Sequence, residues 1–248
     1  MDSAAAAGAV PVALPHPRAH ETGPLWPRFG WGLAALLLSL VSFLFVDHAL
    51  AGYLKAHRYK GELSNLLQAA EHFGTPYGAA LILITLWIVL PETRRRISRT
   101  AAGAIAAGLV ADIGKLLVTR LRPDTFDFAQ PIQASITGFL KFGQGGSRHQ
   151  SFPSAHTAFA FAFAVMLGDL FPRGRVWFLC IAALVALQRV FATAHYPSDV
   201  FAGAAVGWIV ASIFLGPSAL SRFYDRMEER YFPRSSEHSV TTSYSTPR

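Results

Sequence analysis

Long runs of apolar residues alternate with short polar segments along most of this chain. Phe29–Val46 and Phe73–Leu90 contain no charged residue. Each is about as long as a helix that crosses a bilayer, which needs roughly 20 apolar residues. Val200–Leu215 is a third run of this kind and is slightly shorter. These three runs predict transmembrane helices.

Three weaker apolar segments lie between these runs, and each contains a charged residue. They are Thr100–Val118 with Asp112 and Lys115, His156–Phe171 with Asp169, and Val176–Ala194 with Arg189. Charged side chains within a membrane span are costly and usually face the interior of the bundle or a water-filled cavity. The pattern therefore predicts six transmembrane helices, with the functional residues on the three weaker ones.

The predicted fold is an all-α, integral membrane bundle of six helices over residues 25–216. Residues 1–24 are expected to form a disordered cytoplasmic tail, and residues 217–248 a cytoplasmic helix followed by a disordered tail. Between the first two spans, Glu62–Gly74 repeats apolar residues at helical spacing. We expect an interfacial helix on the outer leaflet there. The alternative is a helix that packs against the bundle.

The composition supports a membrane protein and disfavours other classes. Apolar residues make up 52% of the chain and charged residues 15%, whereas soluble domains carry about 25% charged residues. The net charge of +7 could suggest nucleic acid, but the arginines lie between apolar runs and not along one polar face. Cys180 is the single cysteine, which excludes an intrachain disulfide and a cysteine-based zinc site.

Basic residues indicate which end of the bundle faces the cytoplasm. They cluster in the loop with Arg94, Arg95, Arg96 and Arg99, in the loop with Arg173 and Arg175, and in the carboxyl-terminal tail. With six spans, all of these and the amino terminus share the cytoplasmic side. The opposite loops also contain basic residues, including Arg120, Arg122, Lys141 and Arg148, which run against this bias and so suggest a function. A bacterial plasma membrane is the expected location, and an endomembrane facing a lumen fits the same topology.

Three polar clusters border the weaker spans, and the predicted topology brings all three to the outer membrane face. Lys115 and Arg122 are seven residues apart, a spacing that predicts one helix face ended by Pro123. The second cluster is Pro-Ser-Ala-His at residues 153–156, and the third runs from Arg189 through His195 to Asp199.

This pattern resembles the phosphatidic acid phosphatase type 2 (PAP2) superfamily, whose motifs are K-x6-R-P, P-S-G-H and S-R-x5-H-x3-D. The resemblance covers roughly residues 61–216 and includes the six-span layout. Two positions depart from the family pattern, since Ala155 replaces glycine and Gln188 replaces serine. Alanine can supply the same backbone N–H if its φ is negative, so we expect the departures to affect rate or substrate fit and not the reaction type.

The resemblance implies a role for each motif residue. His195 would be the nucleophile that forms a phosphohistidine, Asp199 would fix its tautomer, and His156 would protonate the leaving alkoxide and then activate water. The phosphate would be bound by Lys115, Arg122 and Arg189, together with Ser154 and the backbone N–H of Ala155 at a helix amino terminus. This mechanism needs no metal and no cofactor.

Several alternatives remain open on the residues alone. Ser154 could be a plain helix N-cap, and His195 an interfacial residue with Asp199 capping the last span. His156, His195 and Asp199 could bind a metal, although three nearby cations would oppose it. The expected partner is a membrane lipid phosphate: phosphatidic acid, phosphatidylglycerol phosphate, undecaprenyl pyrophosphate or a lipid A phosphate. A lipid phosphotransferase, or a non-catalytic lipid-phosphate binding or transport protein, would use the same pocket, and the sequence makes no prediction of oligomeric state.

Overall fold

The computed structural model describes residues 26–57, 59–141 and 145–232, which form a mostly helical bundle. The predicted amino-terminal tail and the end of the carboxyl-terminal tail lie outside these residues. The main elements are α1 (Trp26–Phe45), α2 (Asp47–Ala56), α3 (Glu62–Glu71), α4 (Pro76–Val89), α5 (Arg94–Leu117), β1 (Val118–Arg120), β2 (Ile136–Phe139), α6 (Ala155–Leu170), α7 (Arg175–Phe191), α8 (Pro197–Leu215) and α9 (Ala219–Tyr231).

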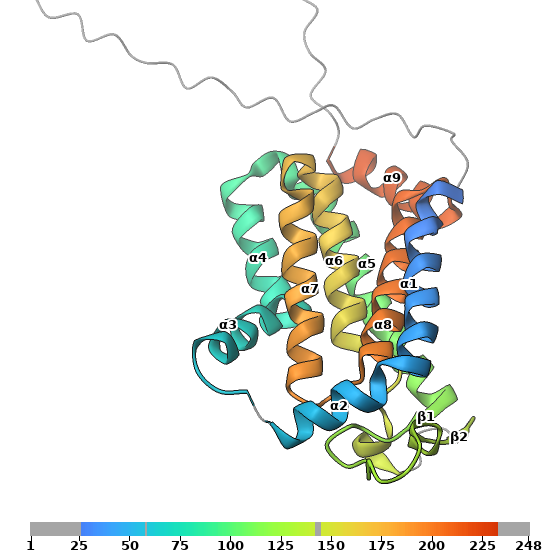
Figure 1. Ribbon diagram of the computed structural model, residues 1–248. Helices are drawn as coiled ribbons and strands as arrows, with labels where there is room; N and C mark the ends of the chain where they lie inside the picture. The colour runs from blue at the N-terminus through green and yellow to red at the C-terminus, as the bar shows by residue number, and fades with distance from the viewer. Residues whose placement is uncertain (1–25, 58, 142–144, 233–248) are drawn as a thin grey trace, which may run out of the picture.

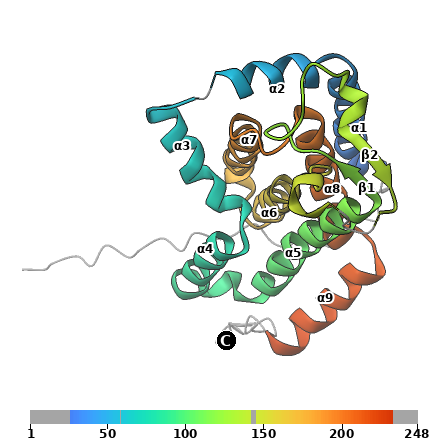
Figure 2. The ribbon, with the colours of Figure 1, turned by 90° about the horizontal axis from the view of Figure 1, so that it is seen from below.

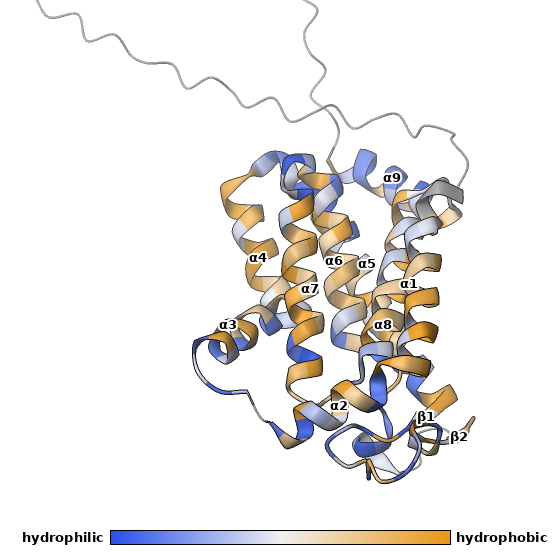
Figure 3. Cartoon of the chain, in the orientation of Figure 1, coloured by the Kyte–Doolittle hydropathy of each residue, from blue (hydrophilic) through white to orange (hydrophobic). Residues whose placement is uncertain are grey.

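The long helices lie side by side, and each predicted span coincides with one of them (Figure 1). Apolar residues occupy the middle of the bundle and polar residues its two ends (Figure 3). Among the described residues, three helical segments are long and apolar enough to cross a membrane. They are Pro91–Leu117, which includes α5, Pro172–Phe191, which includes α7, and α8 itself. The count reaches five if the bent pairs α1–α2 and α3–α4 are single spans, while α6 is shorter, at 16 residues. The mostly helical membrane architecture is therefore confirmed, and the exact number of six spans stays a prediction.

Helix α6 lies in the middle of the bundle, against α5, α7 and α8 (Figure 2). Glycines let α8 approach it closely: a Cβ on Gly203 would lie 2.4 Å from the carbonyl oxygen of Ser154, and one on Gly207 would lie 2.3 Å from that of Ala158. The same approach places the backbone N–H of Ser154 3.1 Å from the carbonyl oxygen of Asp199. Close packing of these helices thus joins the second and third polar clusters.

The chain leaves the helical conformation before Arg122, which corrects two predictions. Helix α5 ends at Leu117, and strand β1 pairs antiparallel with β2 in the following loop. The fold is therefore not purely α, and Lys115 and Arg122 do not share one helix face. The physical reason is that β-branched Val118 and Thr119 favour an extended chain and gain ladder hydrogen bonds from β2.

The connection between the first two long helices contains two short helices. Helix α3 confirms the helix predicted in Glu62–Gly74, whereas α2 was not predicted and bends 68° away from α1. Helix α3 packs against α7 with Leu67 buried, while Leu63 and Leu66 are exposed. It therefore packs against the bundle along one face and leaves apolar side chains exposed on another, and its position at the outer leaflet stays a prediction.

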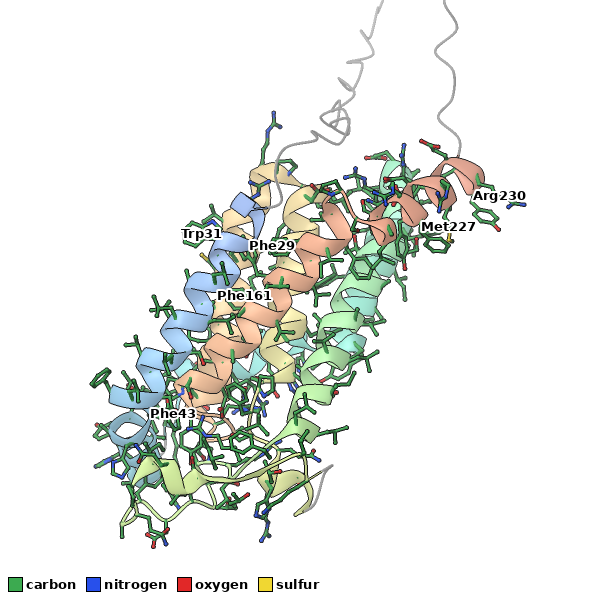
Figure 4. The ribbon with its side chains drawn as sticks, turned by 90° about the vertical axis from the view of Figure 1, so that its right-hand side faces the viewer. Phe29, Trp31, Phe43, Phe161, Met227 and Arg230 are labelled. Atoms are coloured by element: carbon green, nitrogen blue, oxygen red, sulfur yellow. The ribbon has the colours of Figure 1, made fainter. Side chains whose placement is uncertain are left out.

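The basic loops and the polar clusters lie at opposite ends of the bundle. Figure 4 shows Met227 and Arg230 on α9 at one end and Phe43 of α1 near the other. Buried Arg99 of α5 holds α9 in place through ion pairs with Asp225 and with Glu228, the latter at 2.8 Å. The strands and all three motifs lie at the end away from α9 (Figure 1).

Candidate active site

The motif residues of the three clusters converge around His156 in the first turn of α6. Lys115, Arg122, Arg189 and His195 all lie close enough to interact electrostatically with its imidazole. These residues come from the last turn of α5, the loop after β1, the last turn of α7 and the loop between α7 and α8. The structure therefore brings the predicted cations and both histidines close together.

His195 is held in one orientation by a hydrogen bond to the main chain. Its Nδ1 lies 2.7 Å from the carbonyl oxygen of Ser151 and 3.7 Å from the nearer carboxylate oxygen of Asp199. Because a carbonyl can only accept, Nδ1 carries the proton and Nε2 keeps a free lone pair. Burial lowers the pKa of His195 below its ordinary value, helped by Arg189 and Arg122 and opposed by Asp199. The hydrogen bond thus fixes the tautomer, and burial favours the neutral ring.

Asp199 fixes the surroundings of His195 and does not accept the Nδ1 hydrogen bond itself. Its Oδ2 accepts hydrogen bonds from the Ser151 hydroxyl at 2.6 Å and from the Tyr196 N–H at 2.9 Å. Its Oδ1 lies 2.5 Å from Nη1 of Arg120. Ser151 therefore links the two residues, because its hydroxyl binds Asp199 and its carbonyl binds the His195 ring.

Arg120 is the centre of a buried polar network that includes Asp199, the acid next to His195. It is 1% exposed, and its Nη2 pairs with Asp47 at 2.8 Å. Its Nη1 donates to the Ser198 hydroxyl at 2.7 Å, and its Nε donates to the Ser135 hydroxyl at 3.1 Å. The guanidinium lies over the ring of Tyr196, 3.9 Å from its centroid.

Two acids explain why a cation is stable at this buried position. Burial alone would lower the pKa of Arg120, but Asp199 and Asp47 raise it above its ordinary value. No motif identified Arg120 or Asp47 as site residues. The available signal was the position of Arg120 on the side where the orientation rule disfavours arginine.

The predicted phosphate ligands are held by other partners. Arg189 forms an ion pair with Glu71 of α3, a residue the motifs did not identify, and Glu71 Oε1 lies 3.9 Å from Nε2 of His156. Lys115 Nζ pairs with Asp112 at 2.8 Å. Arg122 donates from Nε to the carbonyl oxygen of Ser147 at 2.9 Å. A phosphate that reached Arg189 would compete with the carboxylate of Glu71.

Ser154 is the N-cap of α6, as the structural alternative predicted. It is fully buried, and its hydroxyl oxygen accepts hydrogen bonds from the backbone N–H and the hydroxyl of Thr157. Helix α6 begins at Ala155, so the N–H groups of its first turn lie at a helix amino terminus, which favours anions. Phosphate binding by Ser154 and Ala155 stays a prediction.

The described part of the chain contains no group of three or more histidine, cysteine, aspartate or glutamate side chains placed to hold a metal ion. His156, His195 and Asp199 therefore do not form such a group in this structure.

The chain is similar to known membrane phosphatases in sequence and in fold. The family model of the PAP2 superfamily matches residues 96–218. A lipid A 1-phosphatase of Rhizobium johnstonii is 40% identical over 103 residues, which cover 42% of this chain and 40% of that protein. A decaprenylphosphoryl-5-phosphoribose phosphatase of Mycobacterium tuberculosis is 34% identical over 144 residues, which cover 58% of this chain and 73% of that protein.

A solved structure has the same fold. It is the first transmembrane PAP2 type phosphatidylglycerolphosphate phosphatase from Bacillus subtilis, with a TM-score of 0.54 and 17% identity, covering 83% of this chain and 99% of that chain. The match to the lipid A 1-phosphatases spans less than half of their length.

Proposed function

The chain belongs to the PAP2 superfamily, and from this we propose that it is an integral membrane lipid phosphatase that hydrolyses a phosphate monoester or pyrophosphate through a phosphohistidine. The observation that carries the proposal is the convergence of two histidines and three cations at one end of an apolar bundle. A binding protein would need only the cations. A buried histidine with a free Nε2 is what a nucleophile requires.

In the first step, Nε2 of His195 attacks phosphorus and the bond from phosphorus to the lipid oxygen breaks. Protonated His156 gives its proton to the departing oxygen, because an alkoxide leaves poorly without one. A bound phosphate dianion would supply the negative charge that favours the protonated ring, and the carboxylate of Glu71 lies 3.9 Å from Nε2 of His156. Lys115, Arg122 and Arg189 would stabilise the negative charge on the transferring phosphoryl group.

In the second step, neutral His156 takes a proton from water, and the resulting hydroxide attacks the phosphohistidine. The bond from phosphorus to His195 breaks and inorganic phosphate leaves, which returns both rings to their starting state. Asp199 would stabilise the positive charge that develops on His195 in each step. A phosphotransferase would differ only in using a second lipid hydroxyl in place of water.

The substrate would be an amphiphile whose phosphate lies at the membrane surface. Phosphatidic acid, phosphatidylglycerol phosphate, undecaprenyl pyrophosphate and lipid A phosphates are the candidates. The names of the relatives support lipid A and add a decaprenylphosphoryl phosphoribose.

We further propose that the site faces away from the cytoplasm. The α9 end of the bundle carries the arginine-rich first turns of α5, Arg94–Arg99, and basic residues flanking a span favour the cytoplasmic side. The site lies at the other end. A bacterial plasma membrane is the proposed location.

Trapping of the phosphoenzyme tests this mechanism. Purified protein in detergent, with a chelator present, is mixed with a labelled lipid phosphate or with p-nitrophenyl phosphate and quenched within milliseconds. We expect His195→Ala to form no phosphoenzyme. We expect His156→Ala to form one with the activated substrate only, because nitrophenolate leaves without a proton, and then to accumulate it, because water lacks its base.

Half-buried His149 in the loop before α6 hydrogen-bonds to the carbonyl oxygen of Gly145, so it offers a matched control, and His149→Ala should keep wild-type turnover. A phosphoenzyme in His195→Ala, or turnover that disappears with chelator and returns with zinc or magnesium, would overturn the mechanism. Absence of turnover on every lipid phosphate would favour the binding protein.

A further inference from the structure

A cavity of about 370 Å³ lies between α3 and the carboxyl-terminal end of α7, at the same end of the bundle as the candidate active site. Ligand pockets have volumes of roughly 300–1,000 Å³. The cavity is therefore large enough for one small ring and a few waters, and too small for an acyl chain together with a headgroup.

The walls of the cavity are mostly polar but carry little charge. Six of its nine lining residues have a hydroxyl, amide or carboxylate group: Tyr59, Ser64, Gln68, Asp124, Gln188 and Thr193. Asp124 is the acid among them, and none of the nine is basic. Such walls offer many hydrogen bonds and would repel a second phosphate, so they suit a neutral group with several hydroxyls.

The cavity is connected to the predicted phosphate ligand Arg189 through one pair of neighbouring side chains. Gln188 in the cavity wall accepts a hydrogen bond from Nη1 of Arg189 at 3.3 Å, and the same Nη1 pairs with Glu71. On α3, Gln68 precedes Glu71 by three residues, so the two lie on one face of the helix. A group bonded directly to a phosphate at Arg189 would therefore have the cavity within reach.

The wall of the cavity is held in a defined shape. Thr193 has a φ of +53°, which is uncommon for a β-branched residue, and its carbonyl accepts a hydrogen bond from the N–H of Asp124 at 3.2 Å. Tyr59 packs edge-on against Phe191 at the end of α7, with their ring centroids 5.0 Å apart. These contacts join the end of α7 to the segment before α3, and the α7–α8 loop to the loop after β1.

We propose that this cavity binds a neutral polyhydroxylated headgroup, such as a sugar, that is bonded to the phosphate the enzyme removes. This rests on the proposed phosphatase function and deepens it by naming the substrate class. Gln188 then has a role in place of the serine of the family pattern: its longer side chain contributes an amide to the headgroup cavity while it orients Arg189. Gln68 and Ser64 supply further hydrogen bonds from α3.

A binding experiment tests the cavity independently of turnover. Glucose 1-phosphate and ethyl phosphate carry the same phosphate monoester, but only the first has a sugar. Isothermal titration of the His195→Ala protein in detergent should give a dissociation constant for glucose 1-phosphate about tenfold lower than for ethyl phosphate, as a few hydrogen bonds would provide. Gln68→Ala should remove most of this preference and leave ethyl phosphate binding within twofold.

Asn65 on the same helix is exposed and does not line the cavity, so Asn65→Ala should keep the preference. Equal dissociation constants for the two ligands, or an equal loss of both in Gln68→Ala, would overturn the inference.

A turnover experiment separates the two proposals. In the protein with His195 intact, Gln68→Ala should reduce kcat/KM for a lipid-linked sugar phosphate about fivefold relative to phosphatidic acid. If the sugar preference is present in binding but no lipid phosphate is hydrolysed, the cavity assignment stands and the proposed function fails. If the lipid-linked sugar phosphate and phosphatidic acid are both hydrolysed, and Gln68→Ala does not change the ratio of their kcat/KM values, the function stands and the cavity assignment fails.

Discussion

Replacing Arg120 with methionine should destabilise the protein far more than the loss of an exposed arginine. Methionine removes the charge but keeps much of the length of the side chain. Asp47 and Asp199 are both fully buried, and each pairs with Arg120. Breaking one buried ion pair by removing a partner costs about 3–5 kcal/mol. Because this single change leaves two carboxylates without their cation, we expect a loss of at least about 3 kcal/mol.

A double-mutant cycle with Asp47→Asn tests the electrostatic reason for this loss. The asparagine oxygen can still accept the hydrogen bond from the N–H of Ser198, but one of the two negative charges is gone. Arg120→Met should then cost less in the Asp47→Asn protein than in the wild type, by about 1–3 kcal/mol. The measurement is reversible denaturant unfolding in detergent micelles. Costs that add to within about 0.5 kcal/mol would refute the reasoning.

A milder change tests the effect of the same network on catalysis. Arg120→Lys keeps the positive charge but loses the planar fork that reaches Asp47 and Asp199 together. We expect a folded protein whose kcat falls about tenfold or more with little change in KM, because Asp199 then holds Ser151 and the His195 ring less firmly. Arg148→Met, at an exposed arginine, is the control and should change stability by less than about 0.5 kcal/mol. An unchanged kcat in Arg120→Lys would limit the network to a structural role.

Three further predictions concern charge and topology. Burial lowers the pKa of His195, so the ring stays neutral as the pH falls below 6.5, and the acid limb of kcat/KM should lie below that value. An acid limb above pH 6.5 would contradict a buried nucleophile. Glu71→Gln removes a negative charge from the phosphate pocket, so orthovanadate should inhibit about five- to tenfold more tightly; weaker inhibition would mean that Glu71 assists anion binding. A cysteine at exposed Ser147, in a Cys180→Ala protein, should react with an impermeant thiol reagent outside intact cells, whereas a cysteine at exposed Ser98 should not. The reverse labelling would invert the orientation.

The sequence predicted which neighbouring residues group at the candidate site. It did not predict the ion pairs that join this site to residues far away in the sequence. The spacing within each motif identified Lys115, His156 and His195, because the chemistry of each cluster lies within a few turns of chain. Asp47 is 73 residues from Arg120, and Glu71 is 118 residues from Arg189. A single charged residue carries no information about a partner at such a distance, so these pairs became visible only in the folded chain.

The strand that replaces the end of the predicted helix has a similar explanation. The seven-residue spacing of Lys115 and Arg122 suggested one helix face, and Pro123 was a reasonable helix stop. Val118–Arg120 is extended because it forms an antiparallel strand pair with Ile136–Phe139, a segment outside the reach of any local helical pattern. Long-range pairing of this kind overrides a local helical pattern.

The shortness of α6 bears on how the substrate arrives. Its 16 residues rise about 24 Å, whereas the hydrocarbon core of a bilayer is about 30 Å thick. Because His156 lies in the first turn of this helix, we expect the reaction centre to lie near the level of the lipid ester groups and below the tips of the headgroups. A lipid would then keep its chains in the bilayer throughout the reaction and reach the histidines by diffusion in two dimensions. The encounter rate would depend on the surface density of the lipid and not on its concentration in water.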